Sequence, residues 1–188
     1  MRSALVAAGL AASFVSTAVL SSEARADTVI KNPNDHPAYR AELEPHGDIV
    51  LWHRTYASRY GRYRGFGDPE IGAGFRASIE LADPAFIPSI NNTVAISFGF
   101  DVTNCRFCNR DFSLFLPITM QWNFFLTDKW SVFADLGLMP RTDGFFHYTY
   151  FDFMAEVGGR YHFTDRIALT MRIGYPFITV GPSFFIGG

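Results

Sequence analysis

Lysine and cysteine are scarce in this chain, and each scarcity argues against one class of function. The only lysines are Lys31 and Lys129, and the formal net charge is −2, so no broadly basic surface is available for nucleic acid. The only cysteines are Cys105 and Cys108, and no second pair supplies the further ligands of a structural zinc site. We therefore predict no nucleic-acid partner, no metal and no cofactor.

Long helical segments are also missing from the sequence after residue 26. No helical period stands out there, and no segment resembles a membrane-spanning helix. The charge-free run 112–127 contains Pro117, Gln121 and Asn123, and its apolar and polar residues alternate. Phe, Tyr and Trp make up 16% of the residues, and this aromatic content favours strands over helices.

The N-terminus has the layout of a secretory signal peptide. Arg2 precedes the uncharged, apolar or small residues 4–20, and Ala24-Arg25-Ala26 supplies a small-x-small cleavage signal. We expect a signal peptide over 1–26, a periplasmic segment over 27–41 and one domain over 42–188; a single membrane anchor is the alternative. Export places Cys105 and Cys108 in an oxidising compartment, where a local disulfide is expected, with free thiols as the alternative.

Apolar and polar residues alternate with a period of two along most of the remaining chain. The clearest case is residues 150–163, where one face carries aromatic and aliphatic side chains and the other carries polar or small ones. The pattern predicts eight strands of a length that can span a membrane. These strands are expected at 43–53, 70–81, 94–102, 112–124, 130–139, 150–163, 167–175 and 177–186.

Two connections between the predicted strands are almost identical. Thr127-Asp128-Lys129 and Thr164-Asp165-Arg166 each form a tight turn before the next apolar face begins. The longer connections 55–69, 103–111 and 140–148 alternate with the shorter ones, although 82–91 is also long. Short turns at one end and long loops at the other are typical of up-and-down outer-membrane barrels.

Three features of the strand faces favour a membrane barrel over the alternative, a secreted soluble barrel. The apolar faces from residue 71 to 175 carry no charge, as contact with lipid requires. The polar faces are rich in Gly, Ala and Ser, which fit the narrow interior of eight strands. Aromatic residues lie near the ends of the apolar faces, where membrane girdles are found: Trp122, Trp130, Tyr161, Phe163 and Tyr175.

This combination resembles the small eight-stranded outer-membrane proteins, the class of the OmpA transmembrane domain, OmpX and OmpW. The resemblance is architectural and covers about residues 42–188. It implies an all-β, eight-stranded antiparallel up-and-down transmembrane barrel in the bacterial outer membrane. We expect a monomer in contact with membrane lipid and lipopolysaccharide. The chain departs from these families at its end, where Phe184-Phe185 is followed by Ile186-Gly187-Gly188 instead of a terminal aromatic residue.

The polar faces predict a charged barrel interior in which four arginines meet six acids. Buried charges persist when they are paired and hydrogen-bonded, so a salt-bridged plug is expected, with a proton or ion path as the alternative. The predicted network comprises Glu70, Arg76, Glu80, Asp101, Asp135, Asp152, Glu156, Arg160, Arg166 and Arg172.

Arginine and tyrosine alternate in the first long loop. Arginine forks match phosphate geometry, so an extracellular loop of this kind is suited to lipopolysaccharide phosphates or sugars, while a solvated loop with Arg–Tyr stacking is the alternative. The loop residues are Arg54, Tyr56, Arg59, Tyr60, Arg62, Tyr63 and Arg64.

The leading functional hypothesis is a non-enzymatic barrel with a structural or surface-interaction role. One alternative is a narrow channel or conduit for small or apolar molecules. Another is a lipid A-modifying enzyme, which needs a nucleophile, a base and an orienting acid. His147 and His162 have no serine partner at a motif-like spacing, although a triad assembled from distant residues remains open.

Overall fold

The computed structural model describes residues 32–33, 35–50, 70–83, 87–104, 112–143, 146 and 148–187. The predicted signal peptide, the arginine–tyrosine loop from Arg54 to Arg64 and the predicted Cys105–Cys108 disulfide lie outside these residues. Those three expectations therefore stay predictions from the sequence. No helix in the described part of the chain is long and apolar enough to cross a membrane.

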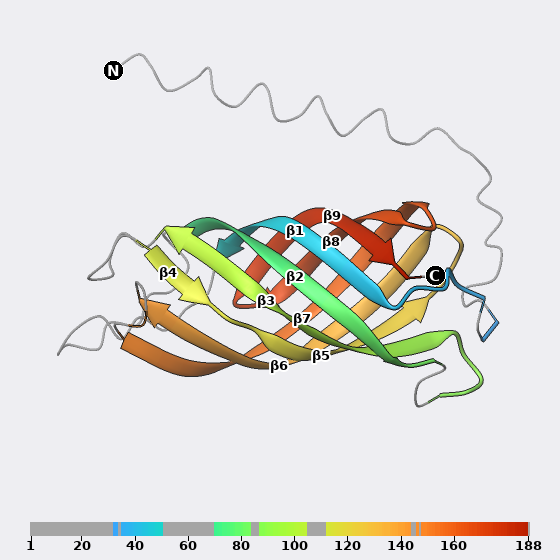
Figure 1. Ribbon diagram of the computed structural model, residues 1–188, viewed down its shortest axis with the longest axis horizontal. Coiled ribbons are helices and arrows are strands. Elements are labelled where there is room, and N and C mark those ends of the chain that lie inside the picture. The colour runs from blue at the N-terminus through green and yellow to red at the C-terminus, as the bar shows by residue number, and fades with distance from the viewer. Residues whose placement is uncertain are drawn as a thin grey trace, which may run out of the picture.

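The described residues form a single closed β-barrel (Figure 1). All neighbouring strands are antiparallel, and the first strand pairs with the last, which closes the sheet. The strands are β1 (Ala41–Val50), β2 (Glu70–Ala82), β3 (Asn92–Asn104), β4 (Phe112–Phe115), β5 (Ile118–Phe125), β6 (Trp130–Asp143), β7 (Tyr148–Thr164), β8 (Ile167–Tyr175) and β9 (Phe177–Ile186).

Strands β4 and β5 together cross the barrel once, so the nine strands make eight crossings. Both pair with β3 on one side and β6 on the other. The break falls at Pro117, which has no amide hydrogen to donate to the ladder. The flanking groups still bond across, since Leu116 N donates to Pro140 O at 2.8 Å and Gly99 N donates to Pro117 O at 3.2 Å. The predicted eight-stranded up-and-down antiparallel barrel is thus confirmed.

The predicted alternation also appears in the burial of the strands. In β8 exposed and buried residues alternate from Ile167 to Ile173, and in β9 the same holds from Thr179 to Ile186. The charged side chains of the described strands point inward or lie near the barrel ends, while the outward positions carry large apolar residues. The barrel therefore has a polar interior and an apolar exterior.

The two similar turns have the same hydrogen bonds. Thr127 Oγ1 accepts from the amides of Lys129 at 3.2 Å and Trp130 at 3.0 Å. Thr164 Oγ1 accepts from the amides of Arg166 at 3.2 Å and Ile167 at 3.1 Å. A threonine hydroxyl that bonds amides two and three residues ahead reverses the chain locally, so each hairpin is set by its own sequence.

An apolar cluster lies at each end of the interior. At the end of the longer connections, Val50 packs with Phe115, Met139, Met154 and Phe177. At the end of the tight turns, Tyr39 packs with Phe125, Ala168 and Phe185. Along β1 the inward positions between Tyr39 and Val50 are all polar, so a charged layer lies between the two apolar clusters.

The segment before β1 belongs to this turn-end cluster and was predicted only as a periplasmic segment. His36 stacks on Phe125 with ring centroids 4.3 Å apart, and its Nδ1 lies 2.6 Å from Asn91 Oδ1. Tyr39 is buried, and this burial raises the pKa of its hydroxyl above the ordinary value, so the side chain stays neutral. The segment thus covers the turn end of the interior.

Candidate functional site

The charged interior contains two distinct clusters, and the first is built around two arginines. We call Arg160, Arg172, Glu42, Glu44 and Asp135 the arginine cluster. Arg160 binds Glu42 through two hydrogen bonds, from Nε at 2.8 Å and from Nη2 at 2.7 Å. Its remaining donors reach Asn123 Oδ1 at 2.9 Å and Gln121 Oε1 at 3.1 Å. A bidentate pair of this kind combines charge with fixed geometry.

Arg172 links Glu44 of β1 to Asp135 of β6 across the interior. Its Nη1 donates to Glu44, and its Nε donates to Asp135 Oδ2 at 3.2 Å. Both arginines are 1% exposed, so these charges have left water almost completely. Removing one partner of such a buried pair is strongly destabilising, because the other charge stays buried without compensation.

Both guanidinium groups lie against the ring of one inward-pointing phenylalanine, Phe133. The Arg160 guanidinium carbon lies 3.9 Å from the Phe133 ring centroid, and that of Arg172 lies 4.8 Å from it. Cation–π attraction strengthens when the groups are desolvated, as they are here. The ring occupies the space above Gly158, its cross-strand neighbour, where an added Cβ would overlap the ring atoms. The glycine thus provides the room that the arginine cluster needs.

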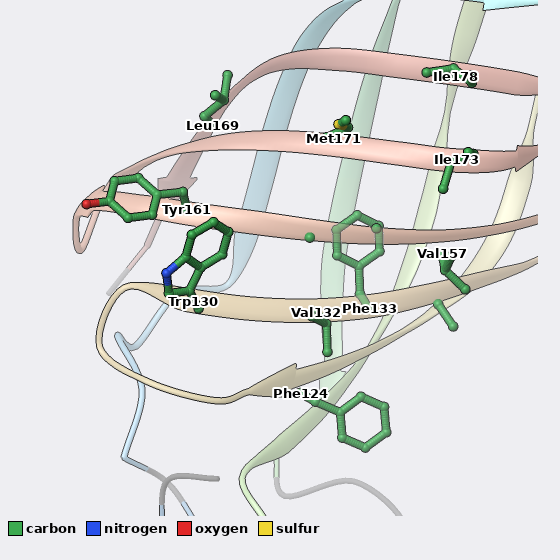
Figure 2. A pocket seen from close by; sticks show the side chains of 13 residues that line it. Phe124, Trp130, Val132, Phe133, Val157, Tyr161, Leu169, Met171, Ile173 and Ile178 are labelled. Carbon is green, nitrogen blue, oxygen red and sulfur yellow. The ribbon is translucent and has the colours of Figure 1, made fainter. Parts of the chain in front are cut away.

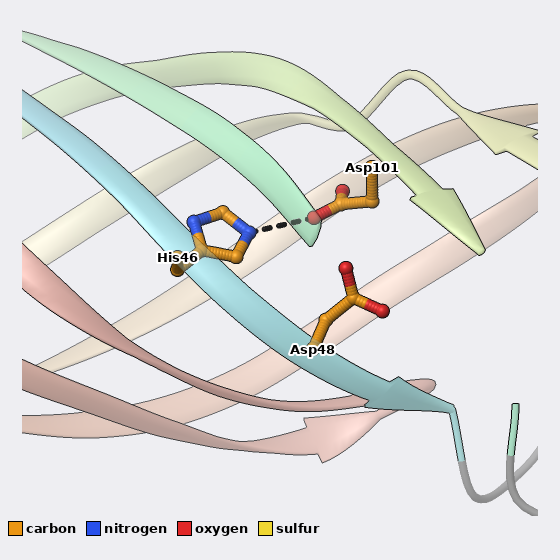
Figure 3. A group of neighbouring side chains, drawn as sticks. All are labelled: His46, Asp48 and Asp101. Atoms are coloured by element: carbon orange, nitrogen blue, oxygen red, sulfur yellow. Dashed lines mark hydrogen bonds and ion pairs between the residues drawn. The ribbon is translucent and has the colours of Figure 1, made fainter. Parts of the chain in front are cut away.

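The second cluster lies on β1, β2 and β3, and we call His46, Asp48, Asp101 and Arg76 the histidine–aspartate cluster. Figure 3 shows three of these residues, His46, Asp48 and Asp101. His46 Nε2 lies 2.7 Å from Asp101 Oδ1, and Arg76 Nη1 donates to Asp101 Oδ2 at 2.5 Å. Asp48 is buried beside them, and neither of its carboxylate oxygens has a hydrogen-bond partner among the described residues. This cluster is therefore incompletely satisfied.

The described interior contains more buried carboxylates than buried arginines. Seven acids (Glu42, Glu44, Asp48, Glu70, Asp101, Asp135 and Glu156) meet four arginines (Arg76, Arg141, Arg160 and Arg172). Glu156, like Asp48, has no hydrogen-bond partner for either oxygen in the described part of the chain. The described arginines alone therefore do not balance the described buried acids.

Most of the network predicted from the sequence lies inside the barrel. The structure buries Glu70, Arg76, Asp101, Asp135, Glu156, Arg160 and Arg172. Glu80 and Asp152 are half-buried near the barrel ends, and Asp152 accepts from the Tyr175 hydroxyl at 2.7 Å. The prediction for Arg166 was wrong, because it is exposed in the turn between β7 and β8. Its position follows strand parity, but the turn begins one residue before it.

The sequence analysis missed several interior residues. Glu42, Glu44, His46 and Asp48 occupy consecutive inward positions of β1, and both clusters include residues from this set. Their alternation with Leu43 and Ile49 was the signal that could have placed them inside. Arg141, which donates to Ser113 Oγ at 3.0 Å, and His162 were also missed.

His162 forms a pair with a serine that the sequence did not indicate. The Ser131 hydroxyl lies 2.9 Å from His162 Nε2, and the imidazole stacks on Phe185 with ring centroids 5.3 Å apart. His162 Nδ1 has no hydrogen-bond partner among the described residues, so none of the described acids orients the ring. A triad needs that third group. His147, the other histidine considered, lies outside the described residues.

The outer face carries a shallow apolar groove of about 770 Å³ across β5 to β9 (Figure 2). Outward side chains such as Trp130, Leu169 and Ile173 form its walls. Gly158 and Gly159, which have no side chains, form part of its floor. Phe133 lies beneath this floor, so the arginine cluster and the outer groove share a thin part of the wall.

The fold and its interior define a class: closed eight-stranded antiparallel barrels with a charged interior and an apolar exterior. No protein-family model matches the chain, and no curated protein is similar enough to match it. The barrel and its charged interior therefore carry the functional argument.

Proposed function

We propose that this protein is a non-enzymatic barrel of the bacterial outer membrane with a structural or surface-interaction role. The observation that carries the proposal is the outer surface. Of the large apolar residues exposed in the described chain, all but Ile87 and Phe146 lie on strands, and no charged side chain occupies an outward strand position in the described part. Apolar surface of this extent is unfavourable in water and is expected to contact another apolar phase or molecule. Membrane lipid matches a continuous uncharged belt of strand side chains.

The distribution of aromatic residues supports the same environment. Near the tight turns Trp130 packs against Tyr161 with ring centroids 5.0 Å apart, and near the opposite end Phe153 stacks on Tyr175 at 4.9 Å. Aliphatic residues such as Leu136 and Met171 lie between these pairs. Aromatic residues at both interfaces of an apolar belt are typical of outer-membrane barrels.

The filled interior favours a structural role over a conduit. Apolar clusters close both ends of the charged layer in the described residues, and Arg160 and Arg172 join opposite walls through the middle. Eight strands leave little more room than their own side chains occupy. The Ser131–His162 pair gives an enzyme little support, because it lies inside the barrel without an orienting acid. Contact of the Arg54–Arg64 loop with lipopolysaccharide remains part of the proposal on sequence grounds.

Membrane fractionation of bacteria that express the full chain tests the proposal. We expect the protein in the outer-membrane fraction, with a folded form that resists detergent and shifts in electrophoretic mobility on boiling. Recovery as a soluble periplasmic protein would overturn it. Planar-bilayer recordings on the same preparation separate the roles: we expect no steady conductance, and reproducible single-channel steps would instead support the channel alternative.

A further inference from the structure

We propose that His46, Asp48 and Asp101 form a binding site for one divalent transition-metal ion inside the barrel. One ligand atom from each residue lies within 4.8 Å of the others, and all three side chains are buried (Figure 3). Metal–ligand distances of about 2.0–2.2 Å place two ligands of one ion about 3.4 Å apart, so small side-chain movements would complete the site. The proposal concerns the interior alone and does not depend on where the barrel is located.

Asp48 is the observation that points to a ligand. Its side chain is 2% exposed and is directed toward His46 and Asp101, yet neither carboxylate oxygen has a hydrogen-bond partner in the described chain. Buried carboxylates are otherwise paired, hydrogen-bonded or coordinated to a metal. Inward residues of this barrel such as Glu42 and Glu44 are bound by arginines, so Asp48 stands out within its own strand.

The hydrogen bonds of His46 leave one nitrogen for a cation. Its Nδ1 lies 3.1 Å from the Glu44 carbonyl oxygen, which can only accept, so Nδ1 carries a hydrogen. Nε2 then faces Asp101 Oδ1 at 2.7 Å, and a lone pair in that position would be repelled by the carboxylate. Either a second proton or a metal ion must lie between them. An imidazole that donates from Nδ1 to a backbone carbonyl is in the usual orientation for metal binding through Nε2.

The local charge also favours a cation. Asp48 and Asp101 are buried carboxylates, and Arg76, which donates to Asp101, is the arginine of this cluster. Glu44 Oε1 lies 3.7 Å from His46 Nδ1, but Glu44 is bound by Arg172. With neutral His46 the cluster is therefore net negative, and a cation at His46 and Asp48 would offset that charge.

Two glycines on β2 provide the space for these ligands. A Cβ at Gly72 would lie 2.7 Å from Asp48 Oδ1, and a Cβ at Gly74 would lie 2.7 Å from His46 Nε2 and would overlap Asp101 Oδ1. Any larger residue would push the three ligand atoms apart. The sequence showed no metal spacing because the ligands come from two strands that are far apart in the chain.

The ligand set favours a transition metal over calcium or magnesium. One imidazole nitrogen with carboxylate oxygens suits Zn²⁺, Mn²⁺ or Co²⁺, whereas Ca²⁺ and Mg²⁺ prefer oxygen alone. The apolar cluster at Val50 lies at the next inward position beyond Asp48. We therefore expect the ion to be incorporated while the barrel folds.

The experiment folds the full mature chain in detergent with Zn²⁺, removes free metal with a chelator and measures bound zinc by mass spectrometry. We expect about one Zn²⁺ per folded chain, a higher thermal midpoint than after metal-free folding, and tetrahedral absorption bands when Co²⁺ replaces Zn²⁺. His46→Gln and Asp48→Asn should lose the bound ion. His162→Gln removes a buried histidine outside this cluster and should keep the bound ion.

Heat-modifiable electrophoresis confirms which variants fold, so loss of metal is scored only on folded protein. Zinc bound by both His46→Gln and Asp48→Asn at the wild-type level would overturn the site. Folded wild-type protein that takes up no zinc, cobalt or manganese would also overturn it and would assign the charge at His46 to a proton. Uptake of Ca²⁺ or Mg²⁺ in preference to Zn²⁺ would contradict the metal class.

Discussion

The arginine cluster and the histidine–aspartate cluster lie next to each other along one strand and differ in how completely they are satisfied. Glu42 is bound by Arg160 of β7, and Glu44 is bound by Arg172 of β8. His46 and Asp48 occupy the next two inward positions of β1. There Arg76 donates to the neighbouring Asp101 of β3, and Asp48 has no hydrogen-bond partner in the described chain. One strand pattern thus places the paired charges of the arginine cluster at one level of the barrel and Asp48, without such a partner, at the next level.

The largest loss of stability is expected when the arginine cluster itself is broken. Arg160→Met leaves Glu42 buried without its partner, so we expect the free energy of unfolding to fall by about 3–5 kcal/mol. Denaturant unfolding of the detergent-folded barrel, followed by tryptophan fluorescence, measures this loss. Arg166→Gln is the matched control, because Arg166 is exposed and its loss should change stability by less than about 0.5 kcal/mol. Equal changes in the free energy of unfolding for the two variants would mean that the arginine cluster does not stabilise the barrel.

Neutralising one acid in each cluster compares the clusters directly. In metal-free protein, Glu44→Gln removes the charge that holds Arg172 and should cost about 1.5–3 kcal/mol. Asp48→Asn removes a charge without a partner in the described chain and should be neutral or stabilising. The same unfolding measurement shows whether each substitution lowers or raises the free energy of unfolding. A loss for Asp48→Asn as large as that for Glu44→Gln, with metal absent, would show that Asp48 already has a partner.

The smallest loss of stability is expected at Gly158, which lies beside the Phe133 ring of the arginine cluster. An alanine at Gly158 would overlap the Phe133 ring, against which both guanidinium groups lie, so we expect the free energy of unfolding to fall by about 1 kcal/mol. Gly159→Ala is the control, because its Cβ would lie 3.9 Å from the nearest atom, Ser131 O. Unfolding midpoints of both variants, measured in parallel, should separate them. Indistinguishable midpoints would mean that Phe133 moves aside freely.

Local rules made much of the fold predictable. The two-residue alternation placed the strands and their faces, and the repeated Thr-Asp-basic motif predicted two turns whose hydrogen bonds match. Boundaries were less predictable. Arg166 has the parity of an inward residue but lies in the turn, and Pro117 divides one crossing into β4 and β5 because it has no amide hydrogen.

The contents of the interior were only partly predictable. Inward parity identified Arg160 and Arg172, but not which acids they bind, since Glu42 lies 118 residues from Arg160 and Glu44 lies 128 residues from Arg172. Tyr39 showed no strand pattern, and only the closed barrel shows that it packs with Phe185 at the turn end.

By itself, then, the sequence determined the strands, their two faces and the hairpin turns, because each depends on residues within a few positions of one another. The tertiary structure alone decided which charges meet, which apolar residues close the two ends and that Asp48 lies without a partner in the described chain beside His46 and Asp101. These outcomes depend on closure between β1 and β9 and on the register of every strand between them, which bring distant side chains to the same level of the barrel.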